Sequence, residues 1–297
     1  MRKISGSPLT KEAMIGFLMV TPALAILAIV YFYPLFYNVD LSFSRWPITE
    51  GLSKYYVGLD NYQNLFTSGD FQKVLGNTVF FTVTSVPLEF FLGLGLALLL
   101  TKEIKGKNAF TTLLSLPMIV APVIAALAWR WFYQFDFGAL NYLLSFVGVK
   151  PILWVSDVNI AMYSVIIADV WTTTPFMMLI LYAGLQMIPI QLYEAAKIDG
   201  ASQWQIFWHV TLPSLRTVLV VALMIRTIDA FTKLFDMVYV ITGGGPGYAT
   251  QVLPIYAYKV GLNFFDLGRG AAISMITLMF SAIMVAVILI ARSSWRK

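Results

Sequence analysis

Residues 160–185 read IAMYSVIIADVWTTTPFMMLILYAGL, an apolar run of 26 residues that carries a single charged side chain, Asp169. A helix that crosses the hydrocarbon core of a bilayer needs about 20 predominantly apolar residues, each adding ~1.5 Å of length. Backbone N–H and C=O groups in lipid must pair within the segment, which favours a helix over an open strand. The run therefore predicts a transmembrane helix.

Five further apolar blocks of similar length accompany this run, at residues 14–37, 78–100, 109–132, 218–240 and 271–291. Hydrophobic residues make up 59% of the 297-residue chain and charged residues 12%, against about 45–50% and about 25% in soluble domains. The short alternating segments of a membrane β-barrel are not seen in the sequence. We expect an all-α polytopic membrane protein with six transmembrane helices, forming one domain over residues 1–297 with a core at about 72–292.

The basic residues between the blocks predict how the chain crosses the membrane. With the N-terminus inside, eleven of the 20 Lys and Arg lie on the inner side and six on the outer side, and the other three fall within helices. Cytoplasmic loops carry the excess of Lys and Arg in membrane proteins. Both termini are therefore expected in the cytoplasm, and the net charge of +5 does not indicate a nucleic-acid partner.

The composition also excludes several kinds of chemistry. Cysteine is absent, which excludes disulfides, a thiol nucleophile and a cysteine-ligated metal. His209 is the single histidine, so a multi-histidine metal site lacks ligands, and its distance in sequence from the membrane carboxylates disfavours an intramembrane enzyme. The sequence contains no G-x-x-x-x-G-K-[ST] run to cradle the phosphates of ATP. We expect neither catalysis nor a cofactor in this chain.

Charged residues fall inside the apolar blocks, where a central charge costs about 2.5–3.5 kcal/mol on insertion scales. A stripe of four is spaced by three, four and three residues, which places its members along one helical face: Arg226, Asp229, Lys233 and Asp236. Their alternating sign permits pairing within the stripe. The stripe either lines a translocation path or forms an ion-pair ladder between helices.

The second and fourth blocks each contain a carboxylate, Glu89 and Asp169, which we interpret as packing or pore residues. Thr172 and Thr173 follow Asp169, and Pro175 frees a backbone carbonyl one turn earlier. Hydroxyl groups both donate and accept hydrogen bonds, and a freed carbonyl accepts them. The pattern predicts a polar cleft in this part of the bundle.

Residues 189–213, on the inner side between the fourth and fifth blocks, form an amphipathic segment. Pro189 can open a helix, and the pair Asp199-Gly200 permits a sharp bend. A second short helix is expected over residues 202–209, with Pro213 breaking it. Composition alone also allows a helix that lies on lipid headgroups.

The spacing within this segment distinguishes the two interpretations. Glu194-Ala195-Ala196, three residues, Gly200, nine residues and then Val210-Thr211-Leu212-Pro213 resembles the EAA motif of ABC importer permeases, which more often have Ile at the position of Val210. Two further stretches are similar to the sugar-uptake branch of that family, which includes maltose, trehalose and glycerol-phosphate permeases: Gly58-Leu59-Asp60-Asn61-Tyr62 and Thr242-Gly243-Gly244-Gly245-Pro246.

This resemblance implies the transmembrane fold of type I (MetI-like) ABC importers in a bacterial or archaeal cytoplasmic membrane. It implies a second permease subunit, two ATPase subunits that bind ATP and Mg, and an extracytoplasmic sugar-binding protein as partners. The residues that it assigns to ATPase coupling are Glu194, Ala195, Ala196, Asp199 and Gly200.

The resemblance also implies a sugar path between the helices on either side of the coupling segment. The matching positions, together with Glu89 as a pore residue, are Thr172, Thr173, Phe176, Arg226, Asp229, Ala230 and Lys233. The expected function is a non-catalytic permease for a sugar, a disaccharide such as trehalose or maltose. The alternative is an ion-coupled secondary transporter, in which Glu89, Asp169 or Asp229 carries a proton or ion.

Overall fold

The computed structural model describes residues 11–46, 51, 53–232 and 234–294. Helices dominate these residues, and two short strands, β1 (Ser44–Arg45) and β2 (Tyr55–Tyr56), pair antiparallel with Arg45 opposite Tyr55. The helices are α1 (Lys11–Leu27), η1 (Ala28–Phe32), α2 (Tyr33–Ser42), α3 (Asp60–Thr67), α4 (Gly69–Thr101), α5 (Lys107–Ile119), α6 (Pro122–Phe132), α7 (Ala139–Ser145), α8 (Ala161–Gln186), α9 (Ile190–Ile198), α10 (Gln203–Ile206), η3 (Phe207–Thr211), α11 (Leu212–Thr232), α12 (Phe235–Ile241), α13 (Leu253–Tyr258), η4 (Lys259–Asn263) and α14 (Leu267–Ser294).

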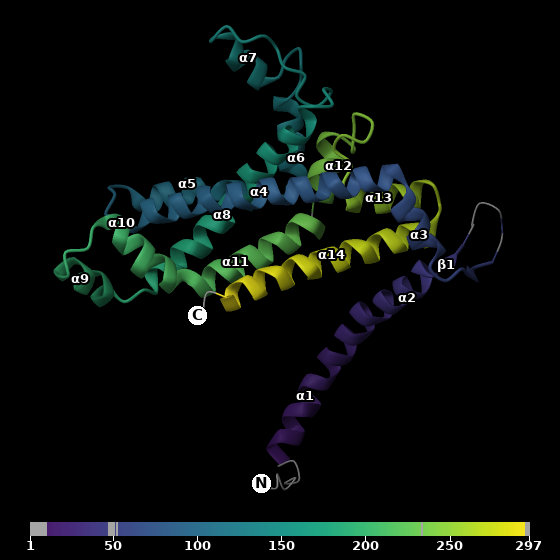
Figure 1. The fold of residues 1–297 in the computed structure, drawn as a ribbon, viewed down its shortest axis with the longest axis horizontal. Helices are drawn as coiled ribbons and strands as arrows, with labels where there is room; N and C mark the ends of the chain where they lie inside the picture. The colour runs from purple at the N-terminus through teal and green to yellow at the C-terminus, as the bar shows by residue number, and fades with distance from the viewer. Residues whose placement is uncertain (1–10, 47–50, 52, 233, 295–297) are drawn as a thin grey trace.

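Five helical stretches among the described residues are long and apolar enough to cross a membrane. They are Ala13–Ser42, Gly69–Thr101, Ala161–Gln186, Gln203–Thr232 and Leu267–Ile290. The bent pair α5 and α6 makes a sixth span if it is counted as one. The predicted all-α membrane fold is thus confirmed, and Figure 1 shows α4, α8, α11 and α14 running side by side as a bundle with α9 at one end and α3 at the other.

The third predicted span differs from a single straight helix. Residues 109–132 divide into α5 and α6, whose axes meet at 94°. Val120 and Ala121 have extended backbone between them, with ψ of 130° and 135°. Pro122 explains the break, since a proline disfavours the helical conformation of the residue before it while fitting the first turn of the next helix.

The fifth span begins earlier and ends earlier than predicted. The prediction that Pro213 breaks the helix is wrong, because one continuous helical stretch runs from Gln203 to Thr232 through η3 and α11. A proline ring clashes with the carbonyl four residues before it in a regular α-helix. Here that residue, His209, lies in the π turn η3, whose wider geometry accommodates Pro213. Residues 235–241 form the separate helix α12.

Close packing at two glycines holds α4, α8 and α11 together. A Cβ atom added at Gly93 of α4 would lie 2.8 Å from the Cβ of Met177 in α8, and one at Gly184 of α8 would lie 2.9 Å from Leu215 in α11. A core cluster made of these three helices includes the fully buried Ala97, Met177, Leu181 and Ala222. The three helices therefore form the tightly packed centre that positions the candidate site.

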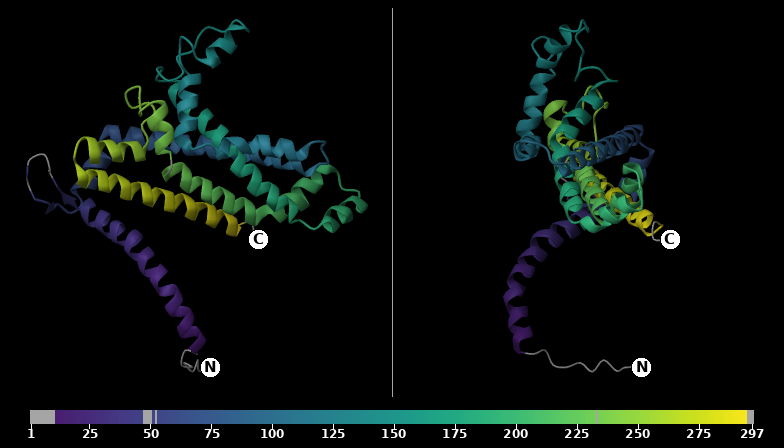
Figure 2. Two further views of the ribbon diagram at one scale, coloured as in Figure 1. Left: turned by 180° about the vertical axis from the view of Figure 1, so that it is seen from behind. Right: turned by 90° about the vertical axis from the view of Figure 1, so that its left-hand side faces the viewer.

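Two parts of the chain extend away from this centre. The helical stretch Ala13–Ser42 buries none of its most apolar window against the rest of the chain and touches the bundle through α2 and α14. Figure 2 shows α1 leaving the bundle on one side, while α6 and α7 rise from the opposite side. The apolar surface of α1 thus faces lipid or another protein chain.

Candidate functional site

One end of the bundle carries a protruding pair of short helices, α9 and α10. Pro189 is the N-cap of α9, and Gly200 makes the turn with φ of +75°, a left-handed conformation that favours glycine. Ser202 then caps α10 in a capping box: the Gln205 backbone N–H donates to Ser202 Oγ at 3.3 Å, and the Ser202 N–H donates to Gln205 Oε1 at 2.8 Å. The expected helix–bend–helix arrangement of this segment is present.

This pair of helices exposes small and apolar side chains together. α9, described along its whole length, buries none of its residues, and Ile198 is 86% exposed. Glu194, Ala195, Asp199 and Gly200 are exposed and Ala196 is half-buried. A hollow of about 360 Å³ beside the turn is lined by Ala196, Asp199, Gly200, Ala201, Gln205, Ile206, His209 and Val210. An exposed apolar surface of this kind is typical of a protein–protein contact.

Three charged side chains from three helices meet inside the bundle. Arg226 of α11 donates hydrogen bonds from Nε and Nη2 to both carboxylate oxygens of Glu89 in α4, the Nη2–Oε1 distance being 2.8 Å. Arg226 Nη2 also donates to a carboxylate oxygen of Asp169 in α8. Glu89 is fully buried and Arg226 is 4% exposed. The two carboxylates accept hydrogen bonds from the planar guanidinium, and the contact with Glu89 is bidentate.

The contacts of Arg226 are those of an ion pair between helices, which is one of the two alternatives given for the charged stripe. Its partners are the two carboxylates on neighbouring helices that the sequence suggests as packing or pore residues. The members of the charged stripe do not all lie on one continuous helix, because α11 ends at Thr232 and Asp236 lies in the first turn of α12. Asp229 is half-buried on α11, and Lys233 lies outside the described residues.

The other predicted path residues lie on α8 and α11. Thr172, Thr173 and Phe176 are half-buried on α8. The two threonine hydroxyls donate to carbonyls of their own helix, to Ala168 at 2.8 Å and to Asp169 at 2.7 Å. Ala230 is 1% exposed and belongs to a core cluster. The side-chain contacts thus bring Glu89, Asp169 and Arg226 together, whereas Ala230 packs into the core.

Two further buried hydroxyls lie on the same helices, and the sequence alone did not single out that of Ser85. Ser85 Oγ, one turn before Glu89 on α4, and Thr174 Oγ1 on α8 have no hydrogen-bond partner among the described residues. Thr174 borders an apolar cavity of about 510 Å³ that also touches Trp129 and Trp171, whose ring centroids are 5.8 Å apart. Residue type does not reveal such hydroxyls, because most serines and threonines in membrane helices bond to their own backbone.

The opposite end of the bundle contains the glycine-rich segment 242–247. Gly243, Gly244 and Gly247 have positive φ angles. Thr250 Oγ1 donates to the Gly245 carbonyl at 2.7 Å and lies 2.7 Å from Thr242 Oγ1. The segment follows the helix α12, whereas a phosphate-binding loop follows a strand. We therefore interpret it as a turn.

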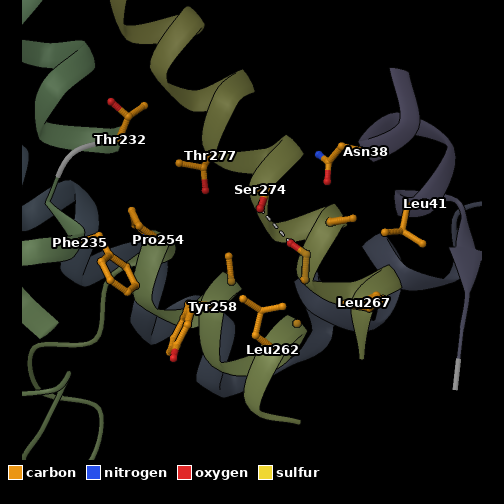
Figure 3. A pocket seen from close by; sticks show the side chains of 14 residues that line it. Asn38, Leu41, Thr232, Phe235, Pro254, Tyr258, Leu262, Leu267, Ser274 and Thr277 are labelled. Carbon is orange, nitrogen blue, oxygen red and sulfur yellow. Dashed lines mark hydrogen bonds between the residues drawn. The ribbon is translucent and has the colours of Figure 1, made fainter. Parts of the chain in front are cut away.

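A second cavity opens between α2, α11 to α13 and α14 near this end (Figure 3). Its volume is about 510 Å³. Ser274 Oγ donates to the Gly270 carbonyl at 3.0 Å along its wall, and Asn38 and Thr232 border it from two other helices. Thr232, at the end of α11, lines this cavity, whereas none of the predicted path residues in the described part of the chain does.

Comparisons with known proteins agree with this geometry. Residues 90–296 match the family described as "Binding-protein-dependent transport system inner membrane component". The chain is 42% identical to the trehalose/maltose transport system permease protein MalF of Thermococcus litoralis, over 90% of each chain. It is 36% identical to the sulfoquinovosyl glycerol transport system permease protein SmoG of Agrobacterium fabrum, over 94% of this chain and 90% of that one.

A solved structure shares the fold. The chain matches a bacterial ABC transporter involved in the import of the acidic polysaccharide alginate, with a TM-score of 0.83 over 97% of this chain and 98% of that one. The sequence identity is 22%, so the match concerns the fold alone. The predicted resemblance to ABC importer permeases is confirmed by the family match over most of the chain and by the relatives: the chain belongs to the family of binding-protein-dependent transport system inner membrane components.

Proposed function

We propose that the chain forms half of the translocation pathway of a binding-protein-dependent ABC importer for a sugar. It spans the cytoplasmic membrane with both termini inside and pairs with a second permease subunit. Two ATPase subunits bind and hydrolyse ATP with Mg, and an extracytoplasmic sugar-binding protein delivers the substrate. This chain supplies the path and the mechanical transmission, because its sequence carries no phosphate-binding loop.

The observation that carries this proposal is the protruding pair α9 and α10. Its turn is fixed by the left-handed Gly200 and by the cap at Ser202, so the pair can transmit force without first becoming ordered. The small, exposed Ala195 allows another backbone to approach closely, and the exposed Glu194 offers a charge to a partner. These features support contact with an ATPase subunit.

Alternating access follows from how this pair is joined to the bundle. α10 continues through η3 into α11 as one helical stretch, and the Thr211 hydroxyl donates to Tyr193 Oη of α9 at 3.3 Å. Displacement of α9 therefore moves α11, and α11 is bound to α4 and α8 through Arg226. Closure of the ATPase subunits on ATP would rock α4, α8 and α11 together, so that the translocation path opens to the outside. ATP hydrolysis would then return these helices to the inward-facing arrangement.

A neutral disaccharide, trehalose or maltose, is the proposed substrate. Relatives are named for these sugars, including a trehalose transport system permease, SugA of Mycobacterium tuberculosis, at 35% identity. The charge of Arg226 is balanced by two carboxylates, which leaves the guanidinium poorly suited to an acidic substrate. Thr172, Thr173, Phe176 and Asp229 then provide hydroxyl, aromatic and carboxylate groups along the proposed path.

Uptake into sealed vesicles tests the proposal against an ion-coupled secondary transporter. The complex is reconstituted with its binding protein, and radiolabelled trehalose or maltose is offered with ATP enclosed. We expect uptake that requires hydrolysable ATP and persists when ionophores collapse ion gradients. Uptake that continues without ATPase subunits and stops with the ion gradient would contradict the proposal. Glu89 and Asp169 bond to Arg226, which disfavours either as a coupling carboxylate.

A further inference from the structure

A polar pocket lies at the end of the bundle opposite α9, where β1, α3 and the start of α14 meet (Figure 1). Its volume is about 360 Å³, which is within the ~300–1,000 Å³ range of small-molecule sites. Six of its seven lining residues are polar or charged: Arg45, Val57, Asp60, Asn61, Asn64, Asp266 and Arg269. The pocket is separate from the proposed path through Arg226.

The motif Gly58–Tyr62, which the proposed path does not use, builds one wall of this pocket. Asn61 donates from Nδ2 to the carbonyls of Ser42 and Ser44, both at 2.9 Å, and Tyr62 Oη donates to Ser42 Oγ at 2.7 Å. These bonds fix α3 against the end of α2 and β1. Asp60 and Asn64 are four residues apart and face the pocket from the same side of α3.

The polar groups of the pocket retain hydrogen-bonding capacity. Arg269 Nε is buried and has no hydrogen-bond partner among the described residues, since its nearest acidic oxygen, on Asp266, is 3.9 Å away. Buried polar groups are normally paired, so orphaned ones at a pocket indicate a ligand or water.

The chemistry of the pocket favours a saccharide over an ion. Two arginines and two aspartates balance in formal charge, so neither an anion nor a cation is selected by net charge. Sugar hydroxyls can donate to Asp60 and Asp266 and accept from Arg45 and Arg269. Tyr55 pairs directly with Arg45 across the two strands and is 47% exposed. Opposite residues share a face of the ribbon, so an aromatic ring is available beside the pocket for the apolar face of a sugar.

We propose that this pocket is a saccharide-binding site on the outer face of the permease, distinct from the site within the membrane. The assignment to the outer face rests on the proposed function, because it takes the end that carries α9 as cytoplasmic. The site would bind the transported sugar, or a sugar of the same class, where it leaves the binding protein.

Hydrogen exchange measured on the whole complex in lipid nanodiscs, without the binding protein, tests this proposal. The probes are trehalose and maltose, and the peptides followed cover residues 55–66 and 264–270. We expect sugar to slow exchange in both peptides. Asn64→Leu should weaken the apparent sugar affinity about fivefold or more, since it removes one hydrogen-bonding group from the pocket. Gln63→Leu, on the exposed side of α3 outside the pocket, should leave it unchanged.

Asn64 is exposed on α3, so its replacement is compatible with folding, and normal assembly of the Asn64→Leu complex verifies this. An absence of sugar-dependent protection in the wild-type peptides would overturn the proposal, and so would equal protection in the Asn64→Leu variant. ATP-dependent sugar uptake, measured with the binding protein added back, distinguishes failure of this site from failure of the proposed function. Uptake without protection of the two peptides refutes this site alone, whereas absence of uptake refutes the proposed function.

Discussion

The guanidinium of Arg226 is bonded to carboxylates from two other helices, Glu89 of α4 and Asp169 of α8. Each of these charges would be costly alone in a bilayer, and together they satisfy one another. Removing one member of a buried ion pair typically costs about 3–5 kcal/mol, because the remaining charge is left uncompensated. The three residues therefore join three helices at one point.

Arg226→Ala should destabilise the purified complex by about 3–5 kcal/mol, because both carboxylates lose their cation. Chemical unfolding monitored by fluorescence in detergent measures this difference. The matched control replaces all three charges at once, with Arg226→Met, Glu89→Gln and Asp169→Asn, and should recover much of the lost stability. If Arg226→Ala unfolded at the same denaturant concentration as the wild type, the buried ion pairs would have no structural role.

Asp229, three residues after Arg226 on α11, is the half-buried carboxylate of the proposed path. Asp229→Ala should reduce sugar uptake by about fivefold or more while the complex still assembles, since a lost hydrogen bond to a charged group costs about 1.5–3 kcal/mol. Initial uptake rates, normalised to the amount of assembled complex, provide the measurement. Unchanged uptake would remove Asp229 from the path.

At the scale of helices, hydrophobicity predicts where the spans lie but not how they bend. The apolar blocks correspond to the five long helical stretches and the pair α5 and α6. The 94° bend at residues 120–121 was missed, although Pro122 is its local signal, because an isolated proline is compatible with both a kink and a helix start. The continuation through Pro213 was missed because a π turn has no pattern in the sequence.

The pairing of charges between helices was also beyond the reach of the sequence. The spacing of Arg226 and Asp229 predicts that they share a helical face, and this information is local. The partners of Arg226 are 137 and 57 residues away, and their positions depend on how α4 and α8 pack. A carboxylate in each of two other apolar blocks was the available signal that a cation must lie nearby.

Helix packing gives a further prediction at Gly93 of α4. Gly93→Ala should destabilise the protein by about 1–3 kcal/mol, because the new Cβ would lie 2.8 Å from Met177 and 2.9 Å from the backbone nitrogen of Met178. Gly95→Ala, two residues along the same helix with open space around it, is the control and should be neutral or slightly stabilising. Thermal unfolding of both variants measures the difference, and equal behaviour would contradict the close approach of α4 and α8.

At the scale of the whole molecule, the proposed function places the end that carries α9 in the cytoplasm and the opposite end outside. The pair α9 and α10 lies at one end, and α3 with the glycine-rich segment lies at the other. Because the chain is free of cysteine, single cysteines introduced at exposed serines report on each end without further changes. An impermeant maleimide should label Ser145→Cys in intact cells and Ser202→Cys only after permeabilisation. Labelling in the reverse order would contradict the orientation.

In the proposed mechanism, α9 transmits force from an ATPase subunit to the membrane helices. Ala195→Cys, exposed on α9, can carry a thiol-linked photo-crosslinker in the complete, transport-competent complex. Mass spectrometry then identifies the chain that it captures. We expect crosslinks to the ATPase subunit, in a yield that changes when ATP binds. Crosslinks to lipid alone, in a complex that still transports sugar with ATP, would contradict it.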